Sequence, residues 1–295
     1  MRTTLWLSAL CTVLLSACGG GSSSDEGAQF GKLNLGVTDS PIDGVKHVVV
    51  EFTGVEVKAV NDASPDVFDF TSPRRIDLLA LEGGGSETLL RDEVMPAGNY
   101  EWIRLKVNAG RTASDSYVDL ADGSRHALFI PSGNQSGLKL IRGFTIGAGS
   151  TSNFTIDFDL RRSVIRPPGQ NGDFVLKPVL RLVDNLQVGT LSGTIAPALV
   201  TPTCMPAVYV FTGADIVPDD VGGTTEPFLT ARVLQSATTG AWGYRIGFMP
   251  VGAYTLAFTC AADADDPETN DTITFVKTKN VSVALAQTTT ADFEP

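Results

Sequence analysis

Met95-Pro96-Ala97-Gly98-Asn99-Tyr100 and Met249-Pro250-Val251-Gly252-Ala253-Tyr254 are two copies of one pattern, and each leads into a run rich in apolar residues. Proline presets the first turn position, and glycine two residues later suits the fourth position of a type I turn. We expect each tyrosine to open a strand with a buried ring and a hydroxyl that caps a neighbouring loop, as in a tyrosine corner. The repeat predicts two β-sandwich domains in tandem.

The composition favours an all-β fold. The chain has 295 residues, of which 43% are hydrophobic, so it has room for two domains with cores of their own. Its 30 glycines and 16 prolines are spread among short apolar runs, as turn-rich β folds require. The formal net charge of -11 argues against a nucleic-acid partner and offers no basic patch to anionic lipid.

The N-terminus has the pattern of a lipoprotein export signal. Residues 1–17 combine Arg2 with an apolar stretch that is typical of a secretory signal and too short to span a membrane. Leu15-Ser16-Ala17-Cys18 resembles the lipobox of bacterial lipoproteins, in which the leader is cut before a cysteine that becomes lipidated. The alternative is an ordinary signal peptide with a chance cysteine. We expect Cys18 to carry acyl chains, palmitate among them, that hold the protein on a membrane.

Residues 18–29 comprise this cysteine and a tether. Gly19–Gln29 offers no side chains for a core and is expected to be flexible. Gly19 stands where an aspartate would resemble the inner-membrane retention signal of Gram-negative bacteria. The expected location is therefore the cell envelope, with the lipid anchor in the outer membrane of a Gram-negative bacterium.

The first folded domain is expected over residues 30–186. Alternation predicts strands whose buried faces are Leu33, Leu35 and Val37, and then Val48, Val50 and Phe52. After Gly54 the apolar positions, Val55 and Val57, are shifted by one residue. Because such a slip turns every side chain to the other face, we expect a β-bulge at Gly54. Asp77–Leu81 is compatible with a strand or with a helical turn.

A later strand carries two carboxylates on one face. Residues 154–160 alternate, with Phe154, Ile156, Phe158 and Leu160 on the opposite face. Asp157 and Asp159 could share acid and base roles in sugar hydrolysis. The alternative, which we favour, is a solvated face on which Arg161 and Arg162 neutralise the charges of the two carboxylates.

Several segments together resemble domain-of-unknown-function 4382, a bacterial and archaeal family frequent in surface lipoproteins. The matching segments are Leu35–Pro41, Gly98–Tyr100 with Ile103–Leu105, Ile130–Gly133, Asp157–Asp159 with Ser163-Val164, and Leu176–Arg181. The resemblance implies an extracytoplasmic β-rich module over roughly residues 30 to 184. It implies no activity.

The second domain is expected over residues 187–295. About seven short apolar runs predict its strands: Val188–Ile195, Ala207–Thr212, Phe228–Leu234, Gly243–Phe248, Tyr254–Cys260, Thr272–Val276 with Val281–Leu285, and Thr289–Phe293. Gly189–Ile195, Gly243–Ile246 and Pro250–Leu256 are similar to carboxypeptidase regulatory-like domains, which are prealbumin-like. The predicted fold is thus two tandem β-sandwiches, immunoglobulin-like or prealbumin-like, after a lipoprotein signal and a flexible tether.

Two cysteines remain once Cys11 leaves with the leader and Cys18 is lipidated. In an oxidising envelope compartment Cys204 and Cys260 are most simply a disulfide. Zinc is a poor alternative, because the histidines, His47 and His126, both lie in the other domain.

Acidic residues crowd the loop after Cys260. Oxygen ligands at this density suggest calcium at Asp263, Asp265, Asp266, Glu268 and Asp271. The spacing lacks the glycine and distal glutamate of the twelve-residue calcium loop, so an acidic solvated loop is the alternative. No other cofactor is expected.

Trp242 and Tyr244 share a strand face, which suits either a sugar-stacking platform or, more commonly, a core. The usual hydrolase, metalloprotease, phosphate-loop and dinucleotide motifs do not occur in the sequence. We therefore expect a non-catalytic envelope lipoprotein that presents two β-sandwiches to a protein partner or to surface material. The alternative is carbohydrate binding through the second domain.

Overall fold

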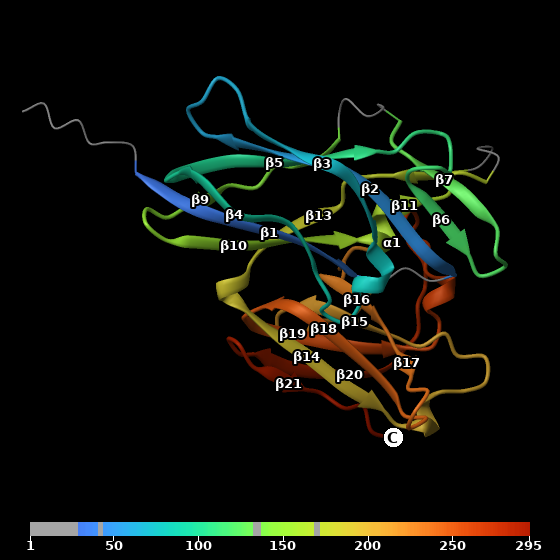
Figure 1. Cartoon of the computed structure of the whole chain (residues 1–295). Coiled ribbons are helices and arrows are strands. Elements are labelled where there is room, and N and C mark those ends of the chain that lie inside the picture. Colours follow the sequence, from blue (N-terminus) through green and yellow to red (C-terminus); the bar gives the residue numbers. More distant parts are fainter. Residues whose placement is uncertain (1–28, 41–43, 132–136, 168–171) are drawn as a thin grey trace, which may run out of the picture.

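The protein folds almost entirely as β-strands, arranged in two halves that lie one above the other (Figure 1). The computed structural model describes residues 29–40, 44–131, 137–167 and 172–295. The leader, most of the tether and Cys18 lie outside these residues. No helix in the described part of the chain has the length and hydrophobicity needed to cross a bilayer.

The first half contains two sheets. The smaller has the strand order β13-β10-β1-β4, and the larger has the order β11-β12-β7-β6-β2-β5-β8, with β3 paired to β2 and β9 to β5. The strands of the smaller sheet are β1 (Phe30–Ser40), β4 (Glu87–Pro96), β10 (Thr151–Asp159) and β13 (Leu180–Asp184). Those of the larger sheet are β2 (Val45–Ala59), β3 (Asp66–Asp77), β5 (Gly98–Asn108), β6 (Tyr117–Leu120), β7 (Arg125–Phe129), β8 (Leu138–Leu140), β9 (Phe144–Ile146), β11 (Val164–Ile165) and β12 (Phe174–Leu176).

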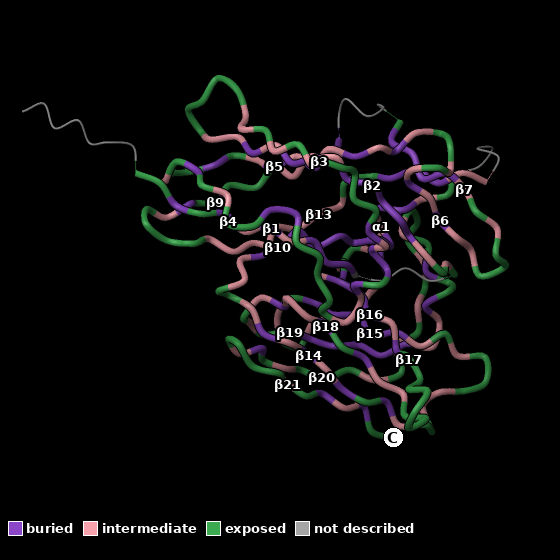
Figure 2. Tube along the Cα trace, viewed as in Figure 1, coloured by how far each residue is buried: buried purple, intermediate pink, exposed green. Residues whose placement is uncertain are grey.

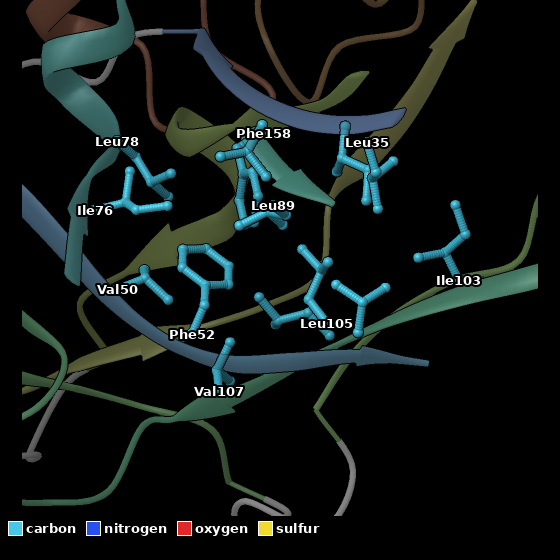
Figure 3. Close-up of a cluster of buried hydrophobic side chains, with 14 of the residues drawn as sticks. Leu35, Val50, Phe52, Ile76, Leu78, Leu89, Ile103, Leu105, Val107 and Phe158 are labelled. Carbon is cyan, nitrogen blue, oxygen red and sulfur yellow. The ribbon is translucent and has the colours of Figure 1, made fainter. Parts of the chain in front are cut away.

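The core of this half is built by the alternation that the sequence predicts. Leu35 of β1 and Phe158 of β10 face Phe52 of β2 across the gap between the sheets (Figure 3). The pairing of β2 with β3 and with β5 slips between Phe52 and Gly54, so the predicted β-bulge is confirmed. A Cβ at Gly54 would lie 2.6 Å from the carbonyl oxygen of Phe68, so a side chain there would require the backbone to move.

Short helices connect some strands. The segment Asp77–Leu81, left open between strand and helical turn, ends β3 and continues as the 3-10 helix η1 (Leu78–Leu81). The other helices are α1 (Leu160–Ser163), η2 (Asn185–Gln187), η3 (Pro197–Leu199) and η4 (Ala262–Ala264).

The second half is a sandwich of two four-stranded sheets, with the orders β17-β18-β14-β21 and β16-β15-β19-β20. Its strands are β14 (Val188–Ile195), β15 (Ala207–Thr212), β16 (Leu229–Arg232), β17 (Leu234–Gln235), β18 (Trp242–Pro250), β19 (Gly252–Thr259), β20 (Phe275–Val283) and β21 (Thr288–Thr290). The expected runs Thr272–Val276 and Val281–Leu285 are parts of one strand, β20. Its main hydrophobic core is formed by residues between 191 and 293 and is separate from that of the first half. A smaller cluster, which includes Tyr209, Phe211 and Val221, is separate from both.

The repeated pattern has the same place in both halves. Ala97 alone separates β4 from β5, and Val251 alone separates β18 from β19. In each case the two strands belong to different sheets, so the repeat carries the chain from one sheet to the other. Tyr100 and Tyr254 are both buried, as the tyrosine-corner interpretation requires.

Buried residues are concentrated in the inner strands of both halves, whereas the outer loops and the edge strands β3 and β20 are largely exposed (Figure 2). Strands β1 and β10 of the first half lie between their own core and the second half (Figure 1). Both faces of that part of the smaller sheet are therefore covered.

Candidate functional site

The two halves meet at the ends of β1 and β10, and the paired carboxylates lie there. Asp157 and Asp159 are buried, with residue exposures of 6% and 9%, so the prediction of a solvated face was wrong. The expected charge pairing is present in part, because Arg162 lies 3.6 Å from the Asp159 carboxylate. Asp157 forms an ion pair with Arg181 of β13, and Asp159 caps α1 by accepting from the backbone N–H of Arg162. The physical reason is that the second half covers the face of β10 that an isolated sandwich would expose to water.

Arg161 crosses the junction. This residue of α1 donates from Nη1 to the Tyr209 hydroxyl at 2.5 Å and to Asp265 Oδ2 at 3.1 Å. The Tyr209 hydroxyl in turn donates to Asp265. The side chains of Arg161 and Asp265 are 7% and 0% exposed, so this ion pair is shielded from water. Hydrogen bonds to ionised groups are about twice as strong as neutral ones.

Burial sets the electrostatics of this triad. It raises the pKa of the Tyr209 phenol, so the hydroxyl keeps its proton and donates it. Burial also raises the pKa of Asp265, while the Tyr209 hydrogen bond and the Arg161 charge act in the opposite direction. The arrangement is a polar bridge between the halves.

Further contacts surround the bridge. Arg162 Nη2 lies 2.5 Å from the Glu226 carboxylate, and Lys177 Nζ lies 2.9 Å from that of Glu268. Arg181 donates to the Phe228 carbonyl oxygen at 2.7 Å, and its guanidinium lies 4.2 Å from the Phe228 ring centre. These contacts extend the junction on both sides of Arg161.

Glycines close the opposite edge of the junction. The turn after η1 contains Gly84, which faces Gly247 of β18. A Cβ on Gly247 would lie 2.5 Å from the Cα of Gly84, so the two backbones are in direct contact. Arg232 and Glu82 form an ion pair of 2.5 Å beside them.

Asp39, at the end of β1, is a buried carboxyl that accepts no hydrogen bond from the described residues. It lines a cavity of about 20 Å³ together with Asp157, Gly84 and Arg245. Burial raises the pKa of Asp39 well above its usual range, and the charges of Asp157, Glu82 and Asp159 raise it further.

A larger groove opens at the edge of the junction. Its volume is about 750 Å³, which lies within the range of small-molecule sites. Glu82 and Gly83 contribute from the first half, and residues of β14, β17, β18 and β21 contribute from the second. Partly buried Trp242 offers an aromatic surface among charged and amide groups, which include Arg232, Arg245, Gln235 and Asp292.

The two aromatic residues that the sequence paired differ in burial. Tyr244 is 5% exposed and donates from its hydroxyl to the Ala291 carbonyl oxygen at 2.7 Å, so it belongs mainly to the core. Both residues line the groove, but Trp242 is only partly buried and offers it the larger aromatic surface.

Of the five calcium ligands expected in the acidic loop, the structure brings two together and leaves three apart. Asp265 and Asp271 come together with Asp220, a residue the sequence analysis missed, and their carboxylate oxygens lie within 4.8 Å of one another. The remaining expected ligands are not part of this group. Asp263 is exposed, Asp266 accepts from the backbone N–H of Glu268, and Glu268 pairs with Lys177.

The disulfide is present. Cys204 and Cys260 are bonded, with Cα atoms 4.5 Å apart. The bond ties the loop before β15 to the end of β19, close to the start of the acidic loop. Cys18, expected to be lipidated, lies outside the described residues.

The residues that the sequence analysis missed are Tyr209, Arg181 and Asp220. Tyr209 occurs in a run of apolar residues, where a tyrosine is expected to be core. Asp220 follows Asp219 in a separate loop. The adjacent acids Asp219 and Asp220 could have indicated a metal ligand. No sequence spacing, however, connects them with the acidic loop at residues 263–271.

A family model described as "Domain of unknown function (DUF4382)" matches residues 30–178. No curated protein matches the chain.

Several solved structures align at low similarity. The Bacillus anthracis TIE protein aligns at 10% identity and a TM-score of 0.22 over 90% of this chain, which spans 34% of that protein. The minor pilin GBS52 of Streptococcus agalactiae aligns at 9% identity and a TM-score of 0.21, with 88% of this chain and 94% of that one covered. A putative adhesin from Bacteroides ovatus aligns at 10% identity and a TM-score of 0.21, with 96% of this chain and 99% of that one covered. Similarity at this level carries no conclusion about function.

Proposed function

Over residues 30–178 this chain belongs to the family described as domain of unknown function DUF4382, and from that premise we propose a non-catalytic, lipid-anchored binding protein of the cell envelope. Its role is to hold a protein partner or surface material, as an adhesion or scaffold protein does. The family description names no activity, so the proposal depends on the geometry of the junction.

The observation that carries the proposal is the buried bridge from Arg161 to Tyr209 and Asp265. A buried ion pair has little freedom to rearrange, because separating its partners leaves a charge unpaired in a medium of low dielectric constant. The halves therefore act as one rigid body, and the groove beside Trp242 keeps its shape. A rigid groove binds a ligand with less loss of conformational entropy than a flexible one.

The proposal includes the domain division and the anchor. We place the first domain at residues 30–186 and the second, a carboxypeptidase regulatory-like sandwich, at 187–295; the two separate cores support this division. Lipid on Cys18 and a tether to residue 29 would hold both domains at the outer membrane. Membrane fractionation tests this point: a Cys18→Ser variant should lose its membrane association, and wholly membrane-bound variant protein would contradict the anchor.

Cross-linking from the anchored protein, followed by identification of what is captured, tests the binding role. Trp242→Ala should abolish specific capture, because it removes the aromatic surface of the groove. Trp102→Ala is the matched control. Trp102 is also partly buried, but lies on β5 of the first half, between Arg104 and Lys139. Equal capture by both variants would exclude the groove as the binding site.

Carbohydrate is the second candidate ligand, and one observation favours it. Trp242 lies among hydroxyl, amide and charged groups in the groove, including Ser192, Gln235 and Asp292. Sugars present an apolar face and polar edges, which suit a ring flanked by hydrogen-bonding groups. A glycan array with the parent and the Trp242→Ala variant distinguishes this ligand class from a protein partner.

A further inference from the structure

Three carboxylates from two separate loops converge beside the bridge between the halves. Asp220 comes from the loop before β16, whereas Asp265 and Asp271 come from the loop after η4. One carboxylate oxygen from each residue lies within 4.8 Å of the others. Calcium binds oxygen at about 2.3–2.6 Å, so two ligands of one ion are at most about 5 Å apart. The separations are therefore small enough for all three oxygens to bind one calcium ion.

Burial makes this group different from a solvated acidic loop. Asp220 has no exposed surface, and the side chain of Asp265 is 0% exposed. Burying a carboxylate without a partner is costly. Exposed acids need no counter-charge from the protein, because water solvates them. Asp265 has Arg161 as its counter-charge. Asp220 has neither that solvation nor an ion pair among the described residues, so its counter-charge must come from elsewhere.

The Asp220 carboxylate supplies the second, independent observation. Its Oδ2 atom accepts from the backbone N–H of Asp271, but its Oδ1 atom is buried and has no hydrogen-bond partner among the described residues. Buried carboxylate oxygens almost always have a partner. A cation bound beside Asp220 would supply that partner.

In the part of the chain that the structure describes, a single cationic side chain forms an ion pair with any of these three acids. Arg161 contacts the group through Asp265. Asp271 accepts from the backbone N–H of Asp266 and from the Thr269 hydroxyl, which are neutral donors. Asp219, next to Asp220, is a further carboxylate held by backbone amides. The group thus keeps an excess of negative charge that a divalent cation would balance.

We propose that Asp220, Asp265 and Asp271 bind a calcium ion that fastens the loop before β16 to the loop after η4. Asp265 also accepts a hydrogen bond from Arg161 of the first half. The ion would therefore hold in place the carboxylate to which the first half is bonded. Calcium fits better than magnesium, because calcium accepts irregular sets of carboxylates and carbonyls and magnesium keeps most of its water. The affinity expected of an extracellular calcium module is a Kd of about 0.1–1 mM.

The test uses the full chain, freed of metal with a chelator and then titrated with calcium chloride in a calorimeter and in thermal unfolding. Calcium at ten times its Kd should raise the Tm by about 3 °C, and magnesium should have a smaller effect. Asp220→Asn and Asp271→Asn should each weaken calcium binding at least tenfold. Asp263→Asn is the matched control, because Asp263 is an exposed acid of the same loop outside the group.

Terbium luminescence gives a readout that does not depend on stability. Terbium replaces calcium at oxygen sites, and the Tyr209 ring, whose hydroxyl contacts Asp265, would transfer excitation to it. The emission should appear in the parent and in Asp263→Asn, fall in Asp271→Asn, and be displaced by calcium. Absence of both heat and emission in the parent would overturn the proposal. So would equal calcium affinity in Asp263→Asn and Asp271→Asn, or carboxylates that share a proton and respond to pH but not to calcium.

Discussion

The Tyr100 hydroxyl donates a hydrogen bond to the carbonyl oxygen of Pro96 at 2.7 Å. Tyr254 makes the same bond to Pro250 at 2.9 Å, four residues back along the chain. In both halves the bond spans the crossing between two sheets and gives the proline carbonyl oxygen a hydrogen-bond donor. Burial raises the pKa of Tyr100 to about 12, so the hydroxyl keeps its proton over the physiological range.

Tyr100→Phe and Tyr254→Phe should each lower the free energy of unfolding by about 1 kcal/mol. Phenylalanine keeps the buried ring and removes only the hydroxyl, so the loss is that of one hydrogen bond. Denaturant unfolding of the two variants and of Tyr117→Phe measures it. Tyr117 is the control, because it is a partly buried residue of β6 outside both corners. Effects no larger than that of the control would show that the corners do not depend on the bond.

Arg161→Ala should be among the most destabilising substitutions at the junction, with a loss of about 3–5 kcal/mol. The variant leaves the fully buried Asp265 side chain without its cation, and an unpaired buried charge costs more than the lost contact itself. Arg91→Ala serves as the control, because Arg91 is exposed. Denaturant unfolding gives the free energies, and limited proteolysis should cut between the halves faster in the variant. Similar stability of the two variants would contradict a buried bridge.

Local pattern was enough to predict much of the fold. The alternation at Leu33, Leu35 and Val37 and the bulge at Gly54 depend on neighbouring residues in one strand, and so does the ring of each corner tyrosine. The junction could not be predicted in this way. Asp157 and Asp159 have the pattern of an exposed face, and only the second half, packed on that face, makes them buried.

The candidate sites show the same limit. The disulfide followed from elimination, because two cysteines were left once the leader and the anchor were assigned. Asp265 lies 104 positions from Arg161, and no spacing rule connects residues so distant. Asp220 is likewise brought to the acidic loop by the fold alone, so a ligand search confined to residues 263–271 misses it.

Gly247→Ala should weaken the junction without changing either core. The new Cβ would lie 2.5 Å from the Cα of Gly84, so one backbone must move. Overpacking of this kind costs about 1–3 kcal/mol. Gly110→Ala is the control, because its Cβ would have no atom within 4 Å. Thermal unfolding and limited proteolysis should report separation of the halves only in Gly247→Ala; unaltered unfolding would mean that the glycine contact is not needed.

Replacing both Cys204 and Cys260 by alanine should lower the free energy of unfolding by about 4 kcal/mol in the chain-entropy model. The bond joins residues 56 positions apart, and the unfolded chain gains that freedom when the bond is absent. Comparison of the variant with the oxidised and reduced parent, by denaturant unfolding, separates loss of the bond from loss of the side chains. Equal stability of the oxidised and reduced parent would contradict the prediction.

Asp39→Asn should stabilise the protein at neutral pH and lose that advantage in acid. Burial raises the pKa of Asp39 in the folded state, with further contributions from Asp157, Glu82 and Asp159, whereas Arg232 lowers it. The folded state therefore holds this proton more tightly than the unfolded state. The stabilisation that results is fully present below the unfolded pKa of about 3.9 and is lost as the pH rises through the folded value.

Between those two pKa values the parent should lose about 1.4 kcal/mol of stability per pH unit from this site, and the variant none. The difference in unfolding free energy between variant and parent should thus grow from pH 4 towards neutrality. Denaturant unfolding at a series of pH values measures it, with Asp62→Asn as the control because Asp62 is exposed. A difference that stays constant with pH would mean that Asp39 is ionised in the folded protein and has a counter-charge at the junction.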